Sequence, residues 1–150
     1  MTTTAVERLR SWMQAQDFTC VLLRTRANFA WLTGGKDNHI VLASEQGVAD
    51  LLVFATRVVC LTLSMEQARI AEEEFHDTAV EVMAAPWYSG LDATRNGLLQ
   101  GEQVASDIPY PGAICAQDAL KELRRNLDAK QIVQYRDTCT CAAIALEDVE

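Results

Sequence analysis

The residues that could do chemistry are few and scattered in this chain of 150 residues. Its only histidines are His39 and His76, and its closest pair of cysteines, Cys139 and Cys141, falls in a helical pattern. Two helical residues at that spacing point about 200° apart, so they cannot bind one metal ion from that helix alone. We therefore expect no complete metal site in this chain.

Motifs of nucleotide binding and nucleophilic catalysis are also missing. The pair Gly34 and Gly35 lacks the further glycines, lysine and hydroxyl residue of a phosphate loop. There is no Gly-x-Ser-x-Gly elbow, and no local pattern indicates a Cys–His nucleophile pair. The acidic run 72–74 places successive carboxylates about 100° apart on a helix, so we interpret it as a solvated surface. The sequence thus predicts no catalytic residue here.

Composition excludes several classes of partner. The net charge is −8 and the thirteen basic residues are scattered, which argues against nucleic acid and anionic membranes. No apolar run approaches the roughly 20 residues of a membrane helix, and the first residues lack the apolar segment of a signal peptide. Five cysteines without a scaffold spacing indicate free thiols, with Cys20 and Cys60 in the core. A cytoplasmic location is the prediction.

Helical and strand patterns alternate along the chain. Thr4 with Glu7 forms a capping box for a helix ending near Asp17, and Ser64 with Gln67 is a similar start for a helix through residue 75. Further helices are expected at 27–33, 91–100 and 117–126, and strands at 18–23, 40–43, 49–54, 58–63, 80–82 and 104–106. The short links 44–48 and 55–57 favour hairpins, hence antiparallel neighbours. The sum is an α/β fold, a mixed β-sheet flanked by helices.

The last stretch of the chain is an amphipathic helix with a clear start. Asp128 is a suitable N-cap, with Gln131 three residues later. An apolar stripe follows at helical spacing, made of Ile132, Tyr135, Cys139, Ala142, Leu146 and Val149. No glycine or proline ends the helix before Glu150. Two interpretations stay open: the helix docks on its own domain, or it is a connector that enters a further domain.

Two motifs carry a resemblance to a known family. Residues 28–34, Asn-Phe-Ala-Trp-Leu-Thr-Gly, resemble the Asn-x-x-Tyr-Leu-Thr-Gly motif of the creatinase/prolidase/aminopeptidase P metallopeptidases, with Trp31 in place of Tyr. Residues 123–136 resemble the family's junction Leu-Arg-x-x-Lys-x-x-x-Glu-Ile-x-x-x-Arg, with Leu127 for Lys and Gln131 for Glu. The motifs occur in the family's order, about 90 residues apart, the length of one domain's body.

The resemblance implies a domain organisation and a function. Residues 1–127 would be a creatinase/prolidase-like N-terminal domain, and 128–150 a connector helix toward a missing C-terminal pita-bread catalytic domain. That domain would hold two divalent metal ions, such as Mn, Co or Zn, through two Asp, one His and two Glu. The chain would be the non-catalytic domain of a Xaa-Pro dipeptidase or aminopeptidase P-like enzyme, contributing to homodimer assembly and to the active-site entrance for proline-containing peptides. The alternatives are the same domain of a creatine amidinohydrolase-like enzyme and a free-standing α/β binding module.

The resemblance also points to one loop. In family dimers the loop after the first motif lies near the neighbouring subunit's active site, which makes Lys36, Asp37 and His39 a candidate substrate-access loop toward the partner subunit. Charged side chains suit recognition of a peptide's terminal ammonium or carboxylate. Alternatively, the loop is only a solvated connection. Residues 86–88, Pro-Trp-Tyr, are a second candidate, either an interface anchor or a lid over the edge of the core.

Overall fold

The structure is a computed structural model that describes residues 4–76 and 78–149. A six-stranded sheet forms its centre, with the order β4-β3-β2-β1-β5-β6. The strands are β1 (Cys20–Thr25), β2 (Gln46–Phe54), β3 (Val58–Leu63), β4 (Glu81–Ala85), β5 (Val104–Ser106) and β6 (Ile114–Cys115). β2 pairs antiparallel with β1 and β3, whereas the pairs β3–β4, β1–β5 and β5–β6 are parallel. The predicted mixed sheet is confirmed.

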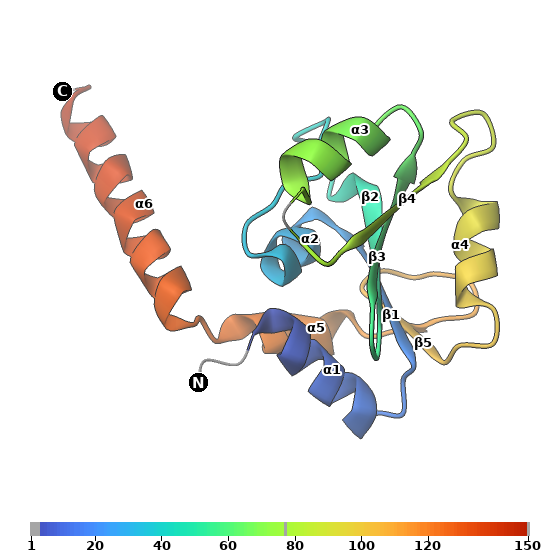
Figure 1. Ribbon diagram of the computed structural model, residues 1–150. Helices are drawn as coiled ribbons and strands as arrows, with labels where there is room; N and C mark the ends of the chain where they lie inside the picture. Colours follow the sequence, from blue (N-terminus) through green and yellow to red (C-terminus); the bar gives the residue numbers. More distant parts are fainter. Residues whose placement is uncertain (1–3, 77, 150) are drawn as a thin grey trace.

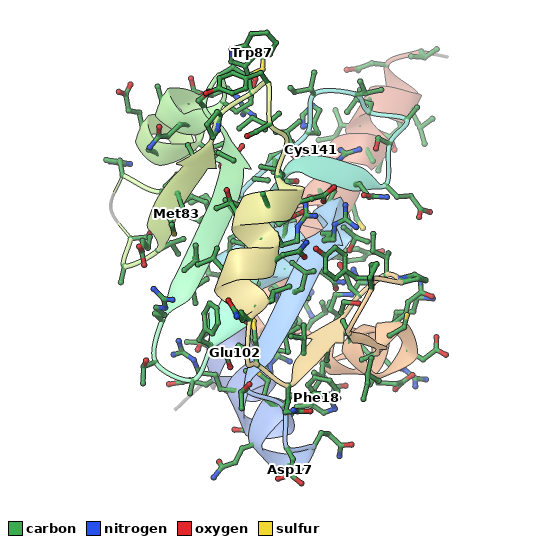
Figure 2. All side chains as sticks on the ribbon, turned by 90° about the vertical axis from the view of Figure 1, so that its right-hand side faces the viewer. Asp17, Phe18, Met83, Trp87, Glu102 and Cys141 are labelled. Carbon is green, nitrogen blue, oxygen red and sulfur yellow. The ribbon has the colours of Figure 1, made fainter. Side chains whose placement is uncertain are left out.

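Helices cover both faces of the sheet. The helices are α1 (Ala5–Ala15), α2 (Arg26–Thr33), α3 (Gln67–Arg69) with its π-helical continuation η1 (Ile70–Glu74), α4 (Asp92–Leu99), α5 (Gln117–Arg125) and α6 (Ala129–Glu147). Residues of α1, α2, η1 and α5 pack with Val21 and Leu23 on one face. α4 lies over the other face, against Cys20 and Leu22 (Figures 1 and 2). This two-sided cover explains why the start of β1 is an uninterrupted apolar run.

The structure confirms two of the three helix caps predicted from the sequence. The capping boxes of Thr4 with Glu7 and of Asp128 with Gln131 are both formed. The Ser64 cap was wrong, because the helix begins two residues after Met65 and its N-cap, Glu66, makes no side-chain capping bond. The Ser64 hydroxyl instead accepts a hydrogen bond from the backbone N–H of Trp87 at 3.3 Å.

The predicted strand at 40–43 is wrong. These residues lie in the loop between α2 and β2, and Ile40, Val41 and Leu42 are 59%, 60% and 73% exposed. The apolar run has strand-like composition but pairs with no strand of the sheet. The link 44–48 is therefore not a hairpin, whereas the hairpin at 55–57 joins β2 and β3 as predicted.

α6 leaves the rest of the fold. In Figure 1 it projects away from the sheet and its covering helices. None of its residues is buried, and Tyr135 and Leu146 of its apolar stripe are 66% and 73% exposed. Within the described residues the helix is therefore not docked on its own domain.

Candidate functional site

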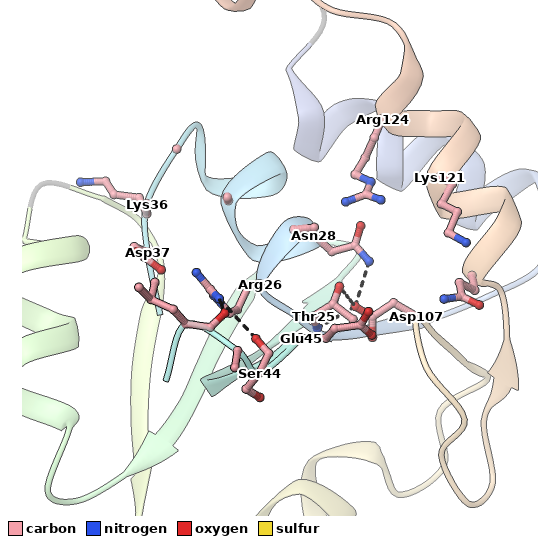
Figure 3. Close-up of a pocket in the computed structure, with 16 residues that line it drawn as sticks. Thr25, Arg26, Asn28, Lys36, Asp37, Ser44, Glu45, Asp107, Lys121 and Arg124 are labelled. Carbon is pink, nitrogen blue, oxygen red and sulfur yellow. Dashed lines mark hydrogen bonds between the residues drawn. The ribbon is translucent and has the colours of Figure 1, made fainter. Parts of the chain in front are cut away.

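The candidate residues lie in a loop, residues 35–45, that links α2 to β2. α2 ends at Gly34, whose φ of 75° is left-handed and lets the backbone N–H of Gly35 bond to the carbonyl of Ala30 at 2.8 Å. Lys36 and Asp37 then line one end of an open cleft, and the Lys36 side chain extends outward at its edge (Figure 3). His39 is not among the residues that line this cleft.

Asp37 and His39 form a local pair. The Asp37 carboxylate accepts a hydrogen bond from the backbone N–H of His39 at 3.0 Å and also contacts Nδ1 of its imidazole. Desolvation acts to raise the pKa of the Asp37 carboxyl, but the hydrogen bonds and charge of His39 outweigh it and the pKa is lowered. The structure therefore brings two of the three predicted residues together, with Asp37 held in its charged form.

The loop is also tied to η1. The backbone N–H of Asp37 donates to Oε2 of Glu74 at 3.1 Å. Glu72 and Glu73 are exposed, as expected of a solvated surface, but that interpretation was wrong for Glu74, which is half-buried at this contact. An acidic run in the sequence gives no sign of which carboxylate meets a distant backbone.

The cleft beside the loop has a volume of about 640 Å³ and a lining of mixed charge, in which four basic residues accompany the carboxylates of Asp37, Glu45 and Asp107. Its basic residues come from α2, the loop and α5, and are Arg26, Lys36, Lys121 and Arg124. Arg26 donates to the carbonyls of Leu42 and Ser44 at 2.8 and 3.3 Å. Within the described residues, Lys36 and Arg124 make no hydrogen bond or ion pair. They are available to an anionic group such as a peptide carboxylate.

Asp107 lies at the base of the cleft and is fully buried. Its carboxylate accepts from the backbone N–H groups of Arg24 and Thr25, both at 2.9 Å, from Oγ1 of Thr25 at 2.6 Å and from Nδ2 of Asn28 at 2.8 Å. It thereby binds the N–H groups of the last two residues of β1, directly before the N-terminus of α2, where the helix dipole favours negative charge. Asp107 was not predicted from the sequence as a site residue. The available signal was an acidic residue directly after a short strand parallel to β1.

The two motifs that carry the resemblance meet at this cleft. Asn28 belongs to the first motif and Arg124 to the second, and Figure 3 shows the Asn28 amide below the Arg124 guanidinium and bonded to Asp107. The profile of the Creatinase/Prolidase N-terminal domain matches residues 6–134. This chain belongs to the creatinase/prolidase N-terminal domain family.

Solved structures agree with that membership. The prolidase from Pyrococcus horikoshii OT3 is 18% identical with a TM-score of 0.68, over 95% of this chain and 41% of that chain. The X-Pro aminopeptidase from Thermotoga maritima MSB8 is 18% identical, with a TM-score of 0.58 over 85% and 37%. An aminopeptidase P from Streptococcus thermophilus is 14% identical, with a TM-score of 0.54 over 80% and 95%. No curated protein matches the sequence.

These identities show a shared fold and no more. This chain spans about two fifths of the length of the Pyrococcus prolidase. No helix among the described residues is long and apolar enough to cross a membrane.

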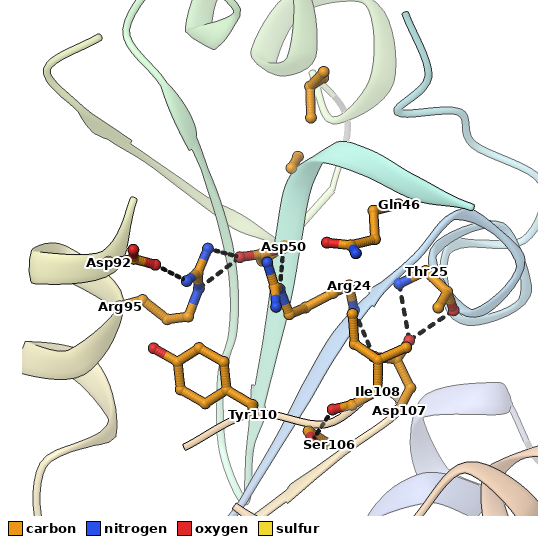
Figure 4. Close-up of polar contacts among 12 residues, drawn as sticks. Arg24, Thr25, Gln46, Asp50, Asp92, Arg95, Ser106, Asp107, Ile108 and Tyr110 are labelled. Atoms are coloured by element: carbon orange, nitrogen blue, oxygen red, sulfur yellow. Dashed lines mark hydrogen bonds and ion pairs between the residues drawn. The ribbon is translucent and has the colours of Figure 1, made fainter. Parts of the chain in front are cut away.

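In this creatinase/prolidase N-terminal domain a second polar cluster lies under α4 (Figure 4). Arg95 donates to the buried carboxylate of Asp50 through Nε at 2.7 Å and contacts it through Nη2 at 2.6 Å; Arg24 Nε is 3.6 Å from the same carboxylate. The ring of Tyr110 lies 5.3 and 5.6 Å from the guanidinium carbons of Arg95 and Arg24. Burial raises the pKa of the Asp50 carboxyl, and the two arginines oppose that shift. The cluster fixes α4 to the sheet.

The described residues do not fit the pair of divalent metal ions that the family resemblance implies. No three His, Cys, Asp or Glu side chains in that part of the chain lie close enough together to hold a metal ion. Cys139 and Cys141 are both exposed on α6.

Trp87 and Tyr88 contact each other edge to face, with ring centroids 5.9 Å apart. They are 66% and 76% exposed, so the interpretation of this pair as a lid over the edge of the core was wrong. An interface role for them remains a prediction.

Proposed function

We propose that this chain is the non-catalytic N-terminal domain of a Xaa-Pro dipeptidase or aminopeptidase P-like metallopeptidase. In this proposal the domain contributes to homodimer assembly and borders the active-site entrance of the partner subunit. The 35–45 loop carries the proposal: charged residues at one end face a cleft, while Ile40, Val41 and Leu42 stand exposed in a row. Exposed apolar residues grouped in this way are typical of surfaces that another protein covers.

The same proposal assigns a partner to α6. Its apolar stripe is uncovered along its length, and a helix with such a stripe gains most of its stability by packing. A C-terminal pita-bread catalytic domain would cover it. That domain, rather than the present residues, would hold the two divalent ions, such as Mn, Co or Zn, that polarise a scissile carbonyl and supply a hydroxide nucleophile.

The cleft would take one end of a proline-containing peptide. Lys36 and Arg124 are unpaired within the described residues and suit a terminal carboxylate, and Asp37 suits a terminal ammonium. A cytoplasmic location belongs to the proposal as well, because all five cysteines are free thiols.

The test starts with the reading frame that encodes this chain. Ordered Asp, Asp, His, Glu and Glu ligands within about 250 downstream residues, a typical domain size, are expected. The complete product should then hydrolyse Xaa-Pro dipeptides with added Mn²⁺, Co²⁺ or Zn²⁺, whereas residues 1–150 alone should not. Hydrolysis of creatine in place of dipeptides would favour the creatine amidinohydrolase alternative. A stop codon directly after Glu150 would favour a free-standing binding module.

A further inference from the structure

The 35–45 loop is attached to the sheet through one fully buried residue, Asn38. Its backbone carbonyl accepts a hydrogen bond from the N–H of Val48 at 2.9 Å. Its side-chain Nδ2 donates to the carbonyl of Ala49 at 2.7 Å. Asp37 and His39 on either side are only half-buried. Asn38 is therefore the one fully buried residue of the loop, and it connects the loop to two successive residues of β2.

Asn38 contacts β2 where the sheet is irregular. Leu23 of β1 faces Leu51, but Thr25 faces Gln46, so residues 47–50 of β2 lie opposite Arg24 alone. Regular pairing is thus interrupted inside β1, between Leu23 and Thr25, one residue before α2 begins. Buried backbone groups that lack partners are costly. Asn38 supplies an acceptor for the N–H of Val48 and a donor for the carbonyl of Ala49.

The neighbouring glycine makes room for Asn38. A Cβ atom on Gly47 would lie 2.1, 2.2 and 2.3 Å from Nδ2, Cγ and Oδ1 of Asn38. Real atoms do not approach so closely, and a buried side chain in a packed site has little freedom to move aside. Gly47 has no left-handed φ, so the requirement at this position is space rather than backbone conformation.

We infer that Asn38 and Gly47 form a lock that holds the 35–45 loop in one arrangement, with Asn38 as the positioning residue for Lys36 and Asp37. A loop fixed in this way loses little further conformational freedom when a peptide or a partner surface binds. The lock follows from contacts within this chain. Only its consequence for substrate access rests on the proposed function.

The first test measures hydrogen exchange in the 150-residue chain for Gly47→Ala, Asn38→Ala and the double variant. Gly47→Ala should expel the Asn38 side chain, so residues 36–45 and the Val48 amide lose protection while β1 keeps it. In the Asn38→Ala background the clash is absent. Gly47→Ala should then leave the melting temperature unchanged or raise it, because alanine restricts the unfolded chain. The loop should nevertheless stay unprotected in the double variant.

Asn38→Asp tests whether the hydrogen bond to Ala49, rather than the shape of the side chain, holds the loop. A carboxylate has nearly the same shape but cannot donate to the Ala49 carbonyl, so the loop should lose protection at neutral pH. Two results would overturn the lock. One is native loop protection in Gly47→Ala; the other is an equal loss of melting temperature from Gly47→Ala in the wild-type and Asn38→Ala backgrounds.

The second test uses the complete enzyme encoded by the reading frame. Release of the loop should raise KM for Xaa-Pro dipeptides and leave kcat nearly unchanged, because the loop does not contact the metals in the proposal. Faster hydrogen exchange in the loop together with an unchanged KM would support the lock, but it would overturn the proposal that the loop contributes to substrate access. Unchanged exchange would overturn the lock and leave the proposed function standing on its own evidence.

Discussion

Burial divides the five cysteines into two chemical groups. Cys20 and Cys60 are fully buried in the core, and desolvation raises the pKa of each thiol to about 12. The other three, Cys115, Cys139 and Cys141, are exposed. Since the thiolate is the reactive species, the buried pair should be inert at ordinary pH.

Alkylation should show this difference directly. Iodoacetamide at pH 8 should modify the three exposed cysteines and leave Cys20 and Cys60 untouched until the chain is unfolded by denaturant. Peptide mass spectrometry with and without denaturant measures the outcome at each position. Rapid modification of Cys20 in the folded chain would contradict its placement in the core.

Asp107 has the most hydrogen bonds at the candidate site, because its carboxylate serves two backbone N–H groups and two side chains. Asp107→Ala leaves the N–H groups of Arg24 and Thr25 without an acceptor. Leaving a buried donor unsatisfied costs about 1–3 kcal/mol, so the free energy of unfolding should fall by at least that amount. Asp137→Ala, at an exposed position of α6, is the matched control and should change stability by less than about 0.5 kcal/mol. Equal denaturation curves for the two variants would refute the assigned role of Asp107.

At the scale of elements, the Asp50–Arg95 pair attaches α4 to the sheet. Arg95→Met should destabilise the fold by about 3–5 kcal/mol, because it leaves a buried carboxylate without its main partner. Arg125→Met removes an exposed ion pair with Glu122 and should cost less than about 0.5 kcal/mol.

The pH dependence of the Arg95→Met penalty has a definite sign. The pKa of the Asp50 carboxyl is higher in the folded chain than in the unfolded chain. Such a group stabilises the fold at pH values below its unfolded-state pKa, and this contribution is lost as the pH rises through its folded-state pKa. Removing Arg95 removes a charge that opposes the rise, so the folded pKa should increase further. The stability gap from wild type should therefore be smaller near pH 4–5 than at pH 7, measured by urea unfolding at each pH. If the difference in unfolding free energy between wild type and Arg95→Met did not depend on pH, Asp50 would not be the group that loses its partner in the variant.

α6 should behave differently from the sheet in the isolated chain. Its residues are exposed, whereas the start of β1 is buried on both faces. Hydrogen exchange should be faster throughout 129–147 than at β1, and slower once a catalytic domain covers the helix. Core-level protection of α6 in residues 1–150 would instead indicate a helix that docks on its own domain.

At the scale of the whole molecule, the proposed access role concerns two subunits. In the complete dimeric enzyme, Asp37→Ala or His39→Ala should change KM or substrate preference with little change in melting temperature, because both residues lie outside the core in a half-buried surface loop and surface positions usually affect stability by less than about 0.5 kcal/mol. Mixing an Asp37→Ala protomer with one that lacks a metal ligand gives hybrids with a single metal-loaded site. If the loop acts on the partner, the metal-loaded Asp37→Ala protomer receives an intact loop and regains near-normal kinetics. Mutant-like kinetics in that hybrid would place the loop's action within its own subunit.

Local rules were enough to predict much of the fold. The capping boxes at Thr4 and Asp128, the apolar run of β1 and the hairpin at 55–57 each depend on residues a few positions apart. The mixed sheet flanked by helices followed from their order, and two short motifs led to the family.

Only the tertiary structure decided where the chain's polar groups are paired and which apolar run joins the sheet. The run at 40–43 has the composition of a strand, but it stays outside because Asn38, rather than that run, meets the backbone of β2. Asp107 binds the end of β1 across more than 80 positions, and the fit of Asn38 on Gly47 requires a loop to fold back onto a strand. Composition and periodicity indicate whether a segment by itself prefers to be buried. The hydrogen bonds of Asp107 and Asn38 depend instead on which backbone groups, distant in the sequence, remain unpaired once the sheet has formed.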